Sequence, residues 1–138
     1  MKVTVDTNTL ISATFWHGDS EKIIIKVEDK EIELVLSTDI INEYADVLDY
    51  DEIKDKIKDK KLEMGYSVGK IISISKIVEP LEKLDVVKED PDDNKILECA
   101  KEGKVDYIIT QDKHLLKLKN FEGIEIVKPD EFLKNIRK

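Results

Sequence analysis

Short runs rich in β-branched residues alternate along this chain with longer stretches that have helical periodicity. Strands are predicted at residues 2–5, 34–37, 107–110 and 125–127, with a weaker candidate at residues 77–78. Helices are predicted at residues 20–29, 38–49, 52–77 (with one or two breaks), 92–102, 113–118 and 130–136. This alternation is typical of parallel strands joined by crossover helices. We therefore expect an α/β fold with a central parallel sheet of about five strands flanked by helices.

The chain is expected to form a single domain over residues 1–138. That length is typical of one compact domain with one core. It has no internal repeat, no low-complexity tract and no linker rich in Pro, Gly or Ser. The least certain boundaries lie in the central helical stretch, where Gly65 and Gly69 each cost up to about 1 kcal/mol against a helix.

The charge balance is acidic, with 31 Asp and Glu against 23 Lys and Arg and a net charge of -8. This excludes a protein that coats nucleic acid through a broad basic face, but it does not exclude a nuclease. The densest basic run, within residues 54–61, alternates with acids and predicts a solvated helix face.

Cysteine content and hydropathy bear on where the protein resides. A single cysteine, Cys99, excludes an internal disulfide and a cysteine-based zinc site. The start of the chain shows no apolar secretory segment, and the longest apolar runs are far shorter than the roughly 20 residues that cross a bilayer. We expect a cytoplasmic protein without a membrane anchor.

Two aspartates follow predicted strands. Asp6 comes directly after the first strand, and Asp112 follows the strand at residues 107–110. In open α/β sheets, ligands bind beyond the carboxyl ends of the strands. Either aspartate could instead only cap the helix that follows it. Their shared position at one sheet edge favours a site.

The segment Asp90-Pro91-Asp92-Asp93-Asn94 contains more acid than a helix start requires. Asp90 as the cap, Pro91 at the first helical position and Asp92 in the first turn satisfy that chemistry. Asp93 shares a helix face with Ile96, Leu97 and Ala100, so we expect its side chain to point toward the sheet. A buried carboxylate is costly unless it has a partner or a metal ion. This favours a functional role for Asp93.

A third group of acids lies on the helix predicted at residues 38–49. Asp39, Glu43 and Asp46 fall on one side of it, bordering an apolar stripe of Ile41, Tyr44, Ala45 and Leu48. Like charges at this spacing repel by a few tenths of a kcal/mol unless a cation lies nearby. A cation site and a solvent-facing acidic flank are both compatible with the pattern.

Carboxylate oxygen is the ligand that hard cations such as Mg²⁺ and Mn²⁺ prefer. The candidate acids Asp6, Glu43, Asp93 and Asp112 could therefore hold one or more divalent ions. The chain contains neither G-x-x-x-x-G-K-[ST] nor G-x-G-x-x-G, so loops that cradle nucleotide phosphates are not expected.

At these residues the sequence resembles the PIN-domain ribonucleases, particularly VapC-type toxins of toxin-antitoxin pairs. The matching stretches are residues 5–8 with 10–12, 37–48, 90–94 with Ala100, and 106–113. The resemblance implies a three-layer fold, metal ligands at Asp6, Glu43, Asp93 and Asp112, and supporting residues Asn8, Thr110 and Asp90. It also implies Mg²⁺ or Mn²⁺, an RNA substrate, a cognate antitoxin and a homodimer. One departure is Gln111, where many relatives have Gly.

Three other readings of the acids compete with the nuclease. A haloacid-dehalogenase-like phosphatase also has an aspartate after its first strand, but it requires a second one where this chain has Asn8. A receiver-like phosphoacceptor would need paired carboxylates after the first strand, and only Asp6 fits. The third is a PIN-fold module that binds RNA or protein without cleaving, which the four intact acids disfavour.

Overall fold

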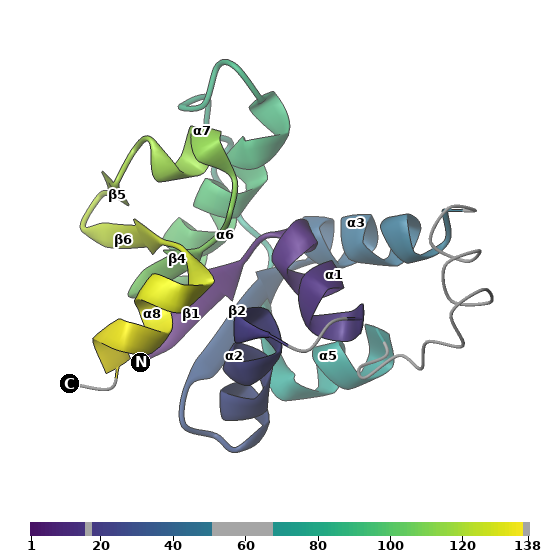
Figure 1. Ribbon diagram of the computed structural model, residues 1–138. Helices are drawn as coiled ribbons and strands as arrows, with labels where there is room; N and C mark the ends of the chain where they lie inside the picture. Colours follow the sequence, from purple (N-terminus) through teal and green to yellow (C-terminus); the bar gives the residue numbers. More distant parts are fainter. Residues whose placement is uncertain (16–17, 51–67, 137–138) are drawn as a thin grey trace.

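The computed structural model describes residues 1–15, 18–50 and 68–136 (Figure 1). The strands are β1 (Lys2–Val5), β2 (Glu33–Ser37), β3 (Ser75–Val78), β4 (Tyr107–Ile109), β5 (Asn120–Phe121) and β6 (Ile124–Val127). The helices are α1 (Thr7–Phe15), α2 (Asp19–Glu28), α3 (Thr38–Leu48), α5 (Val68–Ile74), α6 (Asn94–Gly103), α7 (Lys113–Leu116), α8 (Pro129–Ile136) and the short 3-10 helix η1 (Pro91–Asp93).

The strands form one sheet in the order β3-β2-β1-β4-β6-β5. The first five in this order pair in parallel, which confirms the expected α/β class with its mostly parallel, helix-flanked sheet. β5 pairs with β6 in the antiparallel direction and was not predicted. It has only two residues, too few to produce a recognisable alternation.

The central strands are apolar because helices cover both faces of a parallel sheet. Val3 and Val5 of β1, Leu34 and Leu36 of β2, and Ile108 of β4 have no solvent exposure. α6 packs across β1, β2, β3 and β4, while α1 packs against α2 and α3, and α2 packs against α8. The core therefore lies on the two faces of the sheet.

Most predicted helices are present within a few residues, with two differences. No helix range was predicted before residue 20, yet α1 occupies Thr7–Phe15, where threonines interrupt the apolar pattern. The helix predicted to run to Ile77 ends at Ile74, because residues 75–78 pair with β2 as strand β3. The rest of that prediction, including Gly65 and the basic run at residues 54–61, lies outside the described residues. Within the described ranges, no helix is long and apolar enough to cross a membrane.

The strand order places β1 and β4 side by side at the centre of the sheet, as Figure 1 shows. From β1 the chain moves outward to β2 and then β3, whereas from β4 it moves the opposite way to β6. Such a reversal is a topological switch point, where the carboxyl ends of the two strands flank an open crevice. Residues that follow β1 and β4 therefore meet at one place.

Gly103 marks a close approach of α6 to the sheet. A Cβ atom placed on Gly103 would lie 2.5 Å from Cγ1 of Val35, far inside van der Waals contact. Val35 is completely buried on β2, and its β-branched side chain has little freedom to rotate away. Only glycine lets the end of α6 lie this close to the strand.

We therefore predict that Gly103→Ala destabilises the protein by about 1–3 kcal/mol, the usual cost of overpacking a core. Urea unfolding followed by circular dichroism measures this free energy. Gly18→Ser is the matched control, because a Cβ atom there meets nothing within 4 Å, the backbone is extended, and serine is a good residue at this N-cap position of α2. Equal stability of the two variants would contradict the close approach.

Candidate metal centre

Asp6 lies at the carboxyl end of β1 and caps α1. Its Oδ1 accepts a hydrogen bond from the backbone N–H of Thr9 at 2.9 Å, and its Oδ2 accepts one from the hydroxyl of Thr110. The side chain is nearly buried, with 7% exposure. Asp6 therefore does cap α1, as one of the two interpretations predicted, and it also lines the cleft at the sheet edge.

Thr110 connects the two strand ends. It follows β4, is fully buried, and its Oγ1 accepts a hydrogen bond from the backbone N–H of Asp112 at 2.9 Å while its hydroxyl donates to Asp6. Asp112 in turn caps α7, because its Oδ1 accepts a hydrogen bond from the N–H of His114 at 2.7 Å. One buried threonine thus fixes the spacing of Asp6 and Asp112. Gln111 lies between Thr110 and Asp112 and does not have a positive φ, so the loop does not require glycine at this position.

Asp93 points inward as its helical phase predicted, with 8% exposure. The start of the helix differs from the prediction, because the single turn η1 precedes α6. Asp90 occupies the cap position of η1 but makes no side-chain capping hydrogen bond, so its predicted capping role is wrong. The carboxylate of Asp90 is consequently not committed to the helix.

Asp90, Asp93 and Asp112 converge. Each offers one carboxylate oxygen, and these three atoms lie within 4.8 Å of one another. Oδ2 of Asp93 is buried and has no hydrogen-bond partner in the described part of the chain. Burial, together with the negative charges of Asp112 and Asp90, raises the pKa of Asp93 to about 7.

This arrangement fits a hard divalent cation. Three carboxylates this close repel one another, and a buried oxygen without a donor is costly. A bound Mg²⁺ or Mn²⁺ would relieve the repulsion and give the buried oxygen a partner, since such ions take oxygen ligands and reverse the local sign of the charge. The fit rests on the orphaned oxygen of Asp93 as well as on the number of acids.

Glu43 lies in the same cleft but outside the group of three. It forms an ion pair with Lys95 of α6, whose charge also interacts with Asp39. Burial lowers the pKa of Lys95, and the negative charge of Asp39 partly opposes that effect. Lys95 is therefore the cation that relieves the acidic side of α3, and the sequence patterns did not single it out.

All four predicted acids line one cleft, together with Asp90 and the exposed side chain of Asn8. The predicted apolar stripe of α3 is largely confirmed, because Tyr44 is buried and Ile41 and Leu48 pack partly buried against the core. Ile40, which the prediction left out, is also fully buried. Further polar side chains of this cleft come from Asp92, Lys95, Thr7 and Tyr50. The cleft thus collects residues from the end of β1, the start of α1, α3, η1, α6 and the loop after β4.

The fold and the site together define an α/β domain with an acidic cleft at its topological switch point. Comparison with protein families matches residues 2–114 to the family described as PIN domain. The chain belongs to the PIN-domain family. PIN domains are generally nucleases that hydrolyse phosphodiester bonds. A search among curated proteins found no significant match.

We predict that Asp93→Asn stabilises the metal-free protein at pH 8 but not at pH 4. The folded pKa of about 7 lies above the ordinary value of 3.8, so the folded state holds the proton more tightly. Wild-type stability should therefore fall as pH rises from about 4 to about 7, whereas asparagine stays neutral. The expected advantage at pH 8 is on the order of 1–3 kcal/mol, because one pKa unit corresponds to about 1.36 kcal/mol.

Urea unfolding in the presence of a chelator measures this difference. Groups away from the site titrate alike in both proteins, so the comparison isolates residue 93 and its interaction with the neighbouring carboxylates. A difference that does not change between pH 4 and pH 8 would contradict the raised pKa.

Proposed function

We propose that this chain is a divalent-metal-dependent endoribonuclease. The observation that carries the proposal is the convergence of Asp90, Asp93 and Asp112 around a buried oxygen that has no partner. It lies where the fold opens its central crevice, next to Asp6 and Glu43. Membership of the PIN-domain family supports hydrolysis of a nucleic-acid backbone.

Asp93 and Asp112 would hold Mg²⁺ or Mn²⁺, with Asp90 as a further oxygen donor and Asp6 behind them. When bound, such an ion lowers the pKa of water and neutralises charge on a phosphate. Thr110 keeps Asp6 and Asp112 at a fixed spacing through its two hydrogen bonds. Lys95 pairs with Glu43 in the same cleft, and Asn8 would offer an exposed amide to the substrate.

The competing readings find less support in this geometry. A haloacid-dehalogenase-like phosphatase would use Asp6 as a nucleophile, yet both of its oxygens already accept hydrogen bonds. A receiver-like phosphoacceptor would need a second carboxylate beside Asp6 after β1, and the chain has Thr7 and Asn8 there. A binding module without activity would not need three carboxylates held together against their repulsion. These alternatives differ from the nuclease in the outcome of a single assay.

We predict that the purified protein cleaves an unstructured RNA oligonucleotide in Mg²⁺ or Mn²⁺, and that EDTA stops cleavage until metal is restored. Asp6→Asn and Asp93→Asn should each reduce kcat/KM by at least about 100-fold, because each removes a negative charge from the site. Cleavage is measured with a fluorophore-labelled RNA and a DNA of the same sequence, and folding by circular dichroism.

Asp130→Asn is the matched control, since Asp130 is an exposed aspartate in the first turn of α8 and does not line the cleft. Full activity of both site variants, or cleavage that persists in EDTA, would refute the assignment. RNA binding without cleavage would identify the binding module instead.

We further propose that the protein is a VapC-like toxin that acts as a homodimer and is neutralised by an antitoxin. The support is the resemblance of its four acidic motifs to those toxins. Growth arrest on expression that depends on Asp93 tests the toxin role, and sedimentation analysis tests the dimer. A monomer that is harmless to its host would contradict both.

A further inference from the structure

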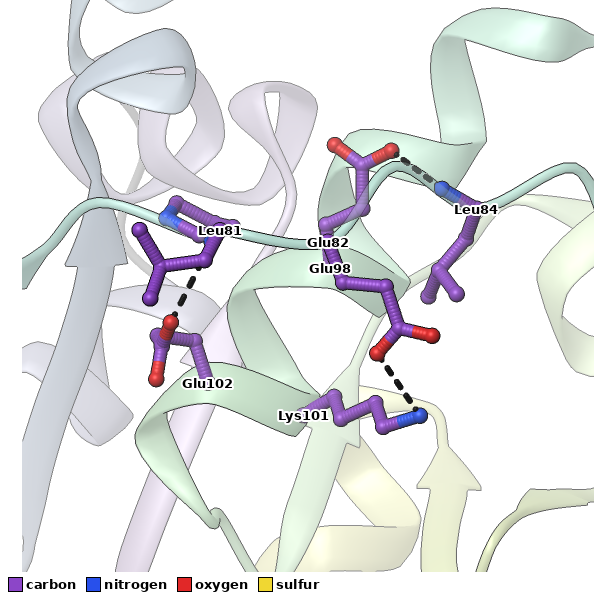
Figure 2. A pocket seen from close by; sticks show the side chains of 7 residues that line it. Leu81, Glu82, Leu84, Glu98, Lys101 and Glu102 are labelled. Atoms are coloured by element: carbon purple, nitrogen blue, oxygen red, sulfur yellow. Dashed lines mark hydrogen bonds and ion pairs between the residues drawn. The ribbon is translucent and has the colours of Figure 1, made fainter.

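Residues 79–90, here called the strap, run along the surface of α6 and are held by its side chains. Oε1 of Glu102 accepts a hydrogen bond from the backbone N–H of Leu81 at 3.2 Å, and Oε2 of Glu98 accepts one from Leu84 at 2.9 Å (Figure 2). The third member of this row is Asn94. Residues 94, 98 and 102 are four apart, so they lie on one face of the helix.

Asn94 makes the most extensive of these contacts. Its Oδ1 accepts hydrogen bonds from the N–H groups of Val86 and Val87 at 2.9 and 2.8 Å. Its Nδ2 donates to the carbonyl oxygens of Val87 and Pro91 at 3.0 and 3.1 Å. The side-chain amide of Asn94 thereby uses both of its N–H donors and both acceptor positions of its oxygen, and the residue is only 5% exposed.

These four bonds enclose the segment that carries the acids. Val87 lies before Asp90, and Pro91 lies directly after it, so one amide joins both ends of the turn that presents Asp90. Asp93 is the residue immediately before Asn94. The other tether of this segment is Glu89, which contacts His114 at 3.1 Å and Lys117 at 3.5 Å. That tether is exposed to solvent and so contributes less.

We propose that Asn94 is a positioning residue that sets where Asp90 and Asp93 stand relative to Asp112, and thereby sets the affinity for the divalent ion. The inference rests on the proposed function. Asn94 acts through the backbone of the turn and does not itself touch the ion. Carboxylates that repel one another stay together only if their backbones are held, and Asn94 supplies that hold for two of the three.

The experiment compares wild type with Asn94→Ala, Asn94→Asp and the control Glu102→Ala. Mn²⁺ affinity is measured by electron paramagnetic resonance of the free ion, and metal-free crystal structures give the position of residues 90–93. Asn94→Ala should weaken Mn²⁺ binding about 10- to 100-fold, the usual effect of losing a residue that orients a ligand. Glu102→Ala removes a tether at the far end of the strap and should change the affinity less than twofold.

Asn94→Asp separates geometry from charge, and it carries the test if the alanine variant does not fold. It keeps the two acceptor positions for Val86 and Val87 but loses the donors to Val87 and Pro91. An added negative charge near the site would by itself strengthen cation binding. Weaker Mn²⁺ binding by this variant therefore supports a geometric role.

Wild-type affinity in both Asn94 variants, with residues 90–93 in place, would overturn the proposal. Failure of the proposed function is distinguishable, because wild-type protein would then bind no Mn²⁺ at millimolar concentration. In that case the metal-free structures still decide the role of Asn94. A displaced Asp90–Asp93 turn in Asn94→Ala supports positioning, and an unchanged turn refutes it.

Discussion

The parallel pairing of β1 with β4 is the contact on which the site depends. Val5 of β1 is in register with Ile109 of β4, so the residues that follow them, Asp6 and Thr110, come side by side. The Thr110 hydroxyl then donates to Asp6, and its oxygen receives the N–H of Asp112. Two chain segments more than 100 residues apart are thus joined at the place where the sheet reverses its direction of growth. The acidic cleft that forms the candidate site opens at this junction.

Electrostatic repulsion is the cost of that arrangement. Asp90, Asp93 and Asp112 stand close enough to raise the pKa of Asp93 to about 7, with burial as the largest cause. Hydrogen bonds keep the acids in place despite this repulsion. The side chain of Asp112 caps α7, and the side chain of Asn94 binds the backbone of the turn that carries Asp90. Glu43 differs from these three acids, because its negative charge is balanced by an ion pair with Lys95. In the described part of the chain, the cleft therefore contains one acid with an ion-pair partner, Glu43, and three converging acids for which no ion pair is seen.

Much of this could be predicted from the chain, and the exceptions have physical causes. Strand positions and the inward phase of Asp93 follow from periodicity, which is a local property. The extent of β3 does not: residues 77–78 were a weak strand candidate that overlapped a predicted helix, and pairing with β2 makes all of residues 75–78 a strand. Capping by Asp6 and Asp112 was foreseen as an alternative to a site, yet both residues serve as caps and also line the cleft. The role of Asn94 was not foreseen, because its four partners include backbone groups seven and eight residues away.

By itself the sequence determined the α/β class, the mostly parallel sheet, the family and the set of acids that gather at one sheet edge. These depend on residue type and short-range spacing, which a single chain displays directly. Only the tertiary structure decided which acids converge, because that depends on strand register and on the turn that Asn94 holds. The sequence predicted Asp90 as a helix cap, whereas in the structure its side chain makes no capping hydrogen bond and lies beside Asp93 and Asp112 as a third carboxylate. The single turn of η1 before α6 is the physical reason, since it frees the side chain of Asp90 from the helix end.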